Sequence, residues 1–176
     1  MEIETKRLLL VPEDILTIDK VVRDVARWNR NGYAHREVIL VTSDITSVRQ
    51  HGVRVKSSYH KDLGRCWYVG SHQGMERKVI WIRGGQTPEE ELYTVVHELV
   101  HGYSGTTISH EEAFRRFCTI ATLAVLDAFP HLRPTDFKVQ TWTEALCMQY
   151  QRYSHHNPYE ADKHIAGYRA YKGSDN

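Results

Sequence analysis

The stretch His97-Glu98-Leu99-Val100-His101 carries the clearest chemical signal in this 176-residue chain. Its two histidines are four residues apart, so on an α-helix both imidazoles project from the same side. Two imidazoles in this arrangement can share one metal ion, and the glutamate beside them is placed to act as a base. The stretch therefore predicts a helix that carries a zinc site, with His97 and His101 as metal ligands and Glu98 as the catalytic group.

The residues around this motif predict the helix itself. Thr87, Pro88 and Glu90 form a helix start, because threonine can cap, proline fits the first helical position and glutamate completes a capping box. Gly102 and Gly105 follow the motif and predict that the helix ends within a turn of it. The apolar side chains of the segment fall on a different side from the histidines, and they are Leu92, Val95, Val96, Leu99 and Val100. We expect one face to pack and another to present the ligands.

The remaining segments predict an α+β fold. Short apolar runs predict strands over 6–11, 38–41, 66–69 and 79–82, with a further half-exposed strand at Val53 and Val55. A glycine-containing loop at 70–74 predicts a hairpin between the last two runs. Further helices are expected over 12–31, 110–129, 135–153 and from 157 to about 173. The length suits one domain over 1–176. We expect this domain to have a zincin-like fold, in which a small, mostly antiparallel sheet packs on the motif helix and additional helices follow towards the C-terminus.

A catalytic zinc ion usually takes three protein ligands, so the two histidines need a partner elsewhere in the chain. A metzincin is excluded, because Ser104 and Thr107 stand where its longer motif requires a glycine and a histidine. A thermolysin-like site would take a glutamate from a later helix, often with an aspartate four residues on. No later glutamate has that aspartate, although Glu160 remains a candidate because its surroundings loosely resemble the glutamate helix of small gluzincins.

A histidine after the motif is the better candidate for the third ligand. His110 is expected to begin the next helix after a short glycine-containing turn, with Ser109 as its cap, so it can return to the same metal. His155 and His156 are further histidines that could take this role. The preferred zinc site is therefore formed by His97, His101 and His110.

The segment His110-Glu111-Glu112-Ala113-Phe114 resembles the HGxxF segment of SprT-like (Spartan-type) zinc metallopeptidases. The similarity covers about 97–117, and Glu111 stands at the position of the family glycine. The resemblance implies that His110 is the third zinc ligand and that Phe114 packs under it. It also implies a zinc-dependent peptidase that cleaves peptide bonds in protein or peptide substrates.

The charge, the cysteines and the apolar segments of the chain argue against several classes of function. The net charge is +1, so no strong field favours nucleic acid, and Arg115-Arg116 is interpreted as part of a solvated surface. The three cysteines form no CxxC pair, which favours a reducing, cytoplasmic setting. The longest apolar region, 119–129, is interrupted by Asp127 and is too short to span a bilayer.

Two functions fit the motif. The first is a peptidase in which Glu98 takes a proton from a zinc-activated water, and in which the strand at 79–83 edges the cleft and pairs with an extended substrate. The second is a zincin-like module that binds metal or a partner without cleaving. The presence of Glu98 favours the peptidase, because a module that only binds has no need of a base.

Overall fold

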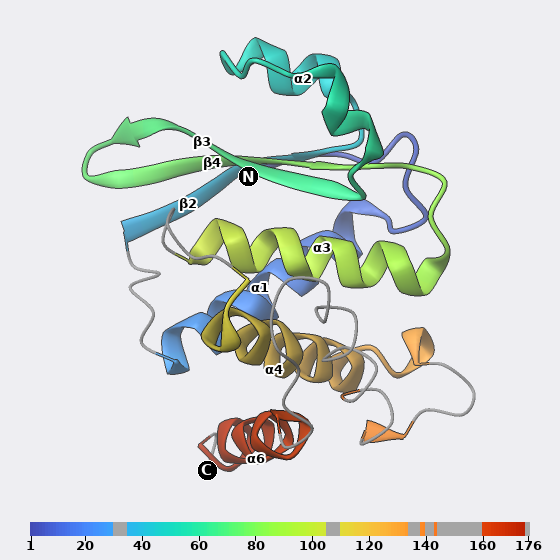
Figure 1. Cartoon of the computed structure of the whole chain (residues 1–176), viewed down its shortest axis with the longest axis vertical. Coiled ribbons are helices and arrows are strands. Elements are labelled where there is room, and N and C mark those ends of the chain that lie inside the picture. The colour runs from blue at the N-terminus through green and yellow to red at the C-terminus, as the bar shows by residue number, and fades with distance from the viewer. Residues whose placement is uncertain (30–34, 105–109, 134–137, 140–142, 144–159, 175–176) are drawn as a thin grey trace. The chain divides into compact units, whose positions relative to one another are not determined.

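A computed structural model of the chain describes residues 1–29, 35–104, 110–133, 138–139, 143 and 160–174. They form two compact units, Met1–Thr106 and Thr107–Asn176 (Figure 1). The first unit contains β1 (Glu2–Glu4), α1 (Pro12–Trp28), β2 (Arg36–Thr42), α2 (Ile45–Gln50), the 3-10 helix η2 (Ser57–Lys61), β3 (Gly64–His72), β4 (Met75–Ile82) and α3 (Pro88–Tyr103). The second contains α4 (Glu112–Ala128), the 3-10 helix η3 (Pro130–Leu132) and α6 (Glu160–Gly173). That 1–176 form one domain stays a prediction.

The sheet of the first unit has the strand order β1-β2-β4-β3. The pairs β1–β2 and β2–β4 are parallel, and only β3–β4 is antiparallel. The α+β class is confirmed, but the prediction of a mostly antiparallel sheet was wrong because the sheet is mixed. Two parallel neighbouring strands need a long connection between them. Helix α1 lies in the connection from β1 to β2, and α2 and β3 lie in the connection from β2 to β4. Short apolar runs in a sequence do not reveal this pairing.

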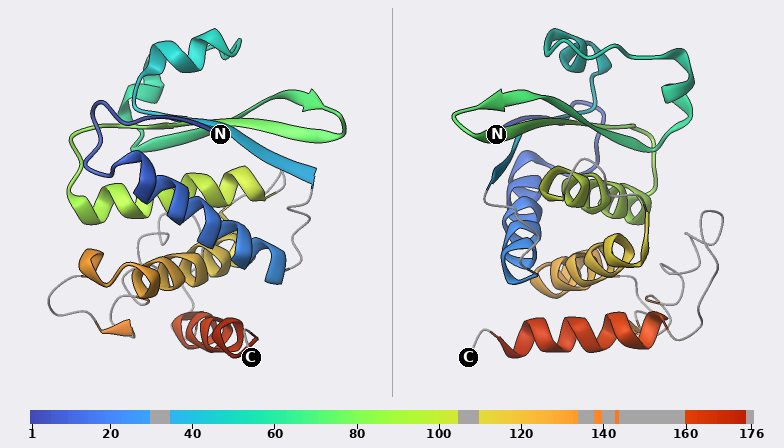
Figure 2. Two further views of the ribbon diagram at one scale, coloured as in Figure 1. Left: turned by 180° about the vertical axis from the view of Figure 1, so that it is seen from behind. Right: turned by 60° about the vertical axis from the view of Figure 1, so that its left-hand side comes forward.

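Strand β4 lies inside the sheet, with β2 on one side and β3 on the other. Figure 2 shows α2 on one face of the sheet and α1 and α3 on the other. Val79 and Trp81 pack with Leu40 and Val48 on the α2 side, whereas Ile80 lies beside α3. The apolar run is continuous because both faces of the strand are covered. The prediction that 79–83 edges a cleft was therefore wrong, and β3 is the edge strand on that side.

Several predicted strand boundaries also differ from the structure. The first strand is Glu2–Glu4 and not 6–11. No strand forms at Val53 and Val55, although both side chains pack against the cluster on the α2 side of the sheet. The two valines alternate with basic residues because their side chains pack on the sheet, and this alternation does not require a strand. The hairpin is confirmed, with a tight turn at Gln73 and Gly74, which have φ angles of 50° and 80°.

The helices agree more closely with the sequence. Helices α1, α4 and α6 lie within the segments predicted at 12–31, 110–129 and 157–173. Most of the helix predicted over 135–153 lies outside the described residues, as does the expected cap Ser109. Within the described ranges, none of the helices is long and apolar enough to cross a membrane.

Candidate metal centre

Helix α3 carries the motif and begins as the sequence predicted. The Thr87 hydroxyl accepts a hydrogen bond from the Glu90 amide at 3.3 Å, and the Glu90 carboxylate accepts one from the Thr87 amide at 3.0 Å. Pro88 occupies the first helical position. The helix continues to Tyr103, within a turn of the motif. The capping box is therefore confirmed, and it fixes where the helix starts and which way its faces point.

The glycine directly after the motif has a packing role that the sequence did not reveal. Gly102 is buried inside α3, and a Cβ added there would lie 2.5 Å from Cγ2 of Val38 and 3.7 Å from Cδ1 of Ile80. A side chain at this position would therefore push the helix away from β2 and β4. Gly102 allows α3 to lie closely on the sheet, which holds the motif residues at a defined height above it.

The two histidines of the motif lie next to each other on α3. The Nε2 atoms of His97 and His101 are 3.1 Å apart, and the ring centroids are 4.8 Å apart. Two nitrogens that bind one tetrahedral zinc ion at its usual bond length lie about 3.3 Å apart. The pair thus has the spacing of two ligands on one ion. Both side chains are partly exposed, so they remain accessible from solvent.

Glu98 is buried on a neighbouring face of the same helix, with 6% of its surface exposed. Its Oε1 atom lies 4.0 Å from Nε2 of His97. Burial raises the pKa of Glu98 to about 8, while Arg65 lowers it and Asp62 raises it further. The carboxyl group is therefore held near the imidazole pair with a pKa close to neutral, as an exchangeable proton carrier requires.

The third predicted ligand, His110, belongs to the second unit and precedes α4. Its ring meets the edge of Phe114 with centroids 5.0 Å apart and an interplanar angle of 79°. Its backbone carbonyl accepts a hydrogen bond from Nη1 of Arg115 at 2.7 Å. Burial and the Arg115 charge both lower the pKa of His110. The imidazole is therefore neutral at physiological pH, which is the form that binds metals.

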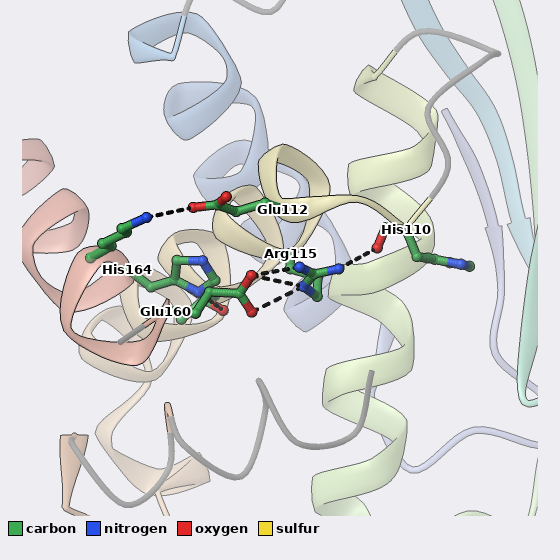
Figure 3. A network of polar contacts seen from close by, with 7 residues as sticks. His110, Glu112, Arg115, Glu160 and His164 are labelled. Carbon is green, nitrogen blue, oxygen red and sulfur yellow. Dashed lines mark hydrogen bonds and ion pairs between the residues drawn. The ribbon is translucent and has the colours of Figure 1, made fainter. Parts of the chain in front are cut away.

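Arg115 connects the start of α4 to α6 in the network of Figure 3. Its Nε and Nη2 atoms donate to the carboxylate of Glu160 at distances between 2.5 and 3.2 Å. Both side chains are buried. The interpretation of Arg115 as a solvated residue was wrong, because its partner lies 45 residues later and leaves no local pattern. Arg115 is therefore a residue of the candidate site that the sequence did not identify.

Two further contacts hold α6 against α4 (Figure 3). His164 is fully buried, and its Nδ1 lies 3.2 Å from the hydroxyl oxygen of Thr119. At the solvent side, Lys163 approaches the carboxylate of Glu112 at 3.4 Å. Burial lowers the pKa of His164 to about 4, so this imidazole is neutral and acts through its hydrogen bond.

Comparisons of the chain with known protein families, with curated proteins and with solved structures found no match. His155 and His156, the other histidines considered as ligands, lie outside the described residues. The functional conclusion therefore depends on the chemistry of the motif helix and of the segment around His110.

Proposed function

We propose that this protein is a zinc-dependent metallopeptidase that hydrolyses peptide bonds in protein substrates, with Glu98 as the general base. The observation that carries this proposal is the pair of imidazoles at ligand spacing beside a buried carboxyl group. A helix with two histidines on its surface by chance has no reason to bury the glutamate between them. The burial of Glu98, whose pKa lies near neutral, fits a group that exchanges protons during catalysis.

The proposed zinc ligands are His97, His101 and His110. Within the first unit, His97 and His101 have the spacing of two ligands on one ion, and within the second unit His110 has a pKa lowered by burial, which favours the neutral, metal-binding imidazole. Glu160, the alternative third ligand, already binds the guanidinium of Arg115 through both carboxylate oxygens. A carboxylate used in this way would have to leave a buried ion pair to bind metal, at a cost of several kcal/mol. We therefore prefer His110.

The proposed reaction divides the chemistry between the ion and the chain. When bound, zinc would supply the Lewis acid chemistry that activates water and polarises a carbonyl group. Glu98 takes a proton from the attacking water and then passes it to the nitrogen of the leaving amine. The neutral form of His110 and its contact with Phe114 would keep the third imidazole ready as a ligand.

Strand β3 is the proposed place for the substrate backbone. It is an edge strand, and an extended peptide can bind such a strand through main-chain hydrogen bonds. It also packs on α3, the helix that carries Glu98. A protein substrate would thus be aligned beside the base without a requirement for one particular side chain. A bound peptide that adds no strand to β3 would refute this part of the proposal.

We also propose that the domain has a zincin-like fold and that the protein works in the cytoplasm. A zincin-like domain of the SprT-like kind is supported by the motif helix packed on a sheet and by the contact between His110 and Phe114. A reducing cytoplasmic setting is supported by Cys66 and Cys118, both of which carry free thiols.

Removal of the metal tests the activity directly. We expect the zinc-loaded protein to cleave fluorescein-labelled casein, a chelator to abolish cleavage, and added zinc to restore it, because the imidazoles alone cannot polarise a carbonyl group. The release of labelled peptides measures the rate. If the protein binds one zinc ion but leaves casein and other unfolded proteins uncut, the alternative of a non-cleaving zincin-like module is favoured.

The third ligand is tested by zinc stoichiometry. We expect His110→Ala to weaken zinc binding by at least about 100-fold, because one of three protein ligands is lost. Glu160→Gln keeps the size of the side chain and should leave one zinc ion bound per chain. Titration against a chromophoric chelator measures both affinities. Loss of zinc in the Glu160 variant with full retention in the His110 variant would reverse the assignment.

A further inference from the structure

Gly64, the first residue of β3, faces the helix that carries Glu98. A Cβ added to Gly64 would lie 2.8 Å from Cγ of Glu98, 3.1 Å from its Oε1 and 2.7 Å from Cγ2 of Thr94. Side-chain carbons do not approach one another this closely in folded proteins. Gly64 is not among the residues with a positive φ. A glycine is therefore required at this position by the lack of room for a side chain and not by the backbone conformation.

Hydrogen bonds hold the chain at this point, so the strand cannot easily move back from α3. The carbonyl of Leu63 accepts hydrogen bonds from the Arg83 amide at 2.8 Å and from Nε2 of Gln86 at 3.1 Å. Oε1 of Gln86 in turn accepts one from the hydroxyl of Thr94 at 2.8 Å. The buried Gln86 side chain therefore ties the start of β3 to α3 one turn before Glu98.

The oxygen of Glu98 that faces Gly64 is the one that lies near the imidazole pair. Oε1 is 4.0 Å from Nε2 of His97, so the carboxyl group lies between the start of β3 and the histidine. We propose that Gly64 is a positioning residue that sets the place of the Glu98 carboxyl group by bringing the backbone of β3 against it. The catalytic consequence rests on the proposed peptidase function, whereas the packing itself does not.

A methyl group at position 64 should act on Glu98 before it acts on the fold. The start of β3 is held by Leu63 and Gln86, whereas the Glu98 side chain can rotate about its own bonds. The carboxyl group would then leave its place beside His97. A displacement of about 1 Å in a catalytic group can lower the rate about 100-fold. The three atoms nearest to the added methyl group belong to Thr94 and Glu98 and not to the imidazole ligands, so zinc binding should persist.

The experiment compares Gly64→Ala with Gly173→Ala, the same chemical change at a glycine whose added Cβ would meet no atom within 4 Å. We expect Gly64→Ala to lower kcat on fluorescein-labelled casein about 100-fold, with KM and zinc stoichiometry unchanged. Gly173→Ala should match the wild type in all three. A Gly64→Ala variant with wild-type kcat would overturn the proposal.

A double variant separates displacement of Glu98 from a general disturbance of the helix. Thr94→Ser removes the methyl group that lies nearest to the added Cβ and keeps the hydroxyl group that binds Gln86. If Gly64 positions Glu98, Gly64→Ala combined with Thr94→Ser stays slow. If activity returns, the loss came from the contact with Thr94, and the proposal is refuted.

A measurement without turnover tests the packing even if the protein does not cleave. The carboxyl carbon resonance of Glu98 in ¹³C-labelled zinc-free protein is identified by its loss in Glu98→Gln. We expect this resonance to shift in Gly64→Ala and to stay in place in Gly173→Ala. A shift in a protein without peptidase activity would support the positioning role while refuting the proposed function. An unchanged resonance would refute the role of Gly64 alone.

Discussion

Replacement of Glu98 by glutamine should lower the rate of peptide hydrolysis about 100- to 10,000-fold while one zinc ion stays bound per chain. Glutamine has nearly the same shape as glutamate, so it should fit the buried position near His97. It cannot take up a proton, however, and the attacking water would lose its base. The kcat on labelled casein and the zinc content of the same sample measure the two effects.

Glu89→Gln is the matched control, because this glutamate lies on the same helix but is exposed. The control should cleave casein at the wild-type rate. If Glu98→Gln retained full activity with bound zinc, the proposed role of Glu98 would be wrong. If it lost zinc as well as activity, the glutamate would act on the metal site and not as a base.

The stability of Glu98→Gln shows whether a loss of activity in this variant could be caused by unfolding. Burial raises the pKa of Glu98 from 4.5 to about 8, so the folded zinc-free protein holds this proton more tightly than the unfolded chain. The stabilising effect of the proton is present below about pH 4.5 and is lost as the pH rises towards 8. Zinc-free Glu98→Gln should therefore be at least as stable as the wild type at pH 8, and a loss of activity cannot then be ascribed to unfolding.

Replacement of Arg115 by methionine should lower the free energy of unfolding of the zinc-free protein by about 3–5 kcal/mol. The variant leaves the Glu160 carboxylate buried without its guanidinium partner. Arg116→Met is the matched control, since the neighbouring arginine is exposed and its loss should cost far less. Urea unfolding measures both variants. Equal stability of the two variants would mean that the buried pair does not support this unit.

A double variant separates stability from metal binding. Arg115→Met combined with Glu160→Leu replaces the ion pair by apolar side chains and should recover most of the lost stability. Zinc affinity should nevertheless stay lower than in the wild type, because the hydrogen bond from Arg115 to the His110 carbonyl is still missing. Recovery of zinc affinity together with stability would show that Arg115 serves the fold only.

The parts of the fold and of the site that the sequence predicted well are those whose causes are local. The capping box at Thr87 and Glu90, the start of α1 at Pro12 and the turn at Gly74 each depend on a few consecutive residues. The spacing of His97 and His101 is likewise a property of one helix. Such features can be predicted without knowledge of the rest of the chain.

The parts that the sequence did not predict depend on contacts between distant segments. The central place of β4 follows from its pairing with β2 and β3, which an apolar run alone does not specify. Arg115 was interpreted as exposed because its partner Glu160 comes 45 residues later. Gly64 has no distinctive sequence signal, since only the approach of α3 makes its missing side chain necessary.

The sequence by itself determined the groups on which the proposed chemistry depends: a capped helix with two imidazoles on one side and a carboxyl group beside them. Helical periodicity is a local property, so five residues suffice to state which groups can act together. The tertiary structure decided the environment of those groups. Burial against β3 raises the pKa of Glu98, and the buried Arg115–Glu160 pair fixes the backbone at His110. Desolvation and side-chain packing depend on residues far apart in the chain, and only folding brings these together.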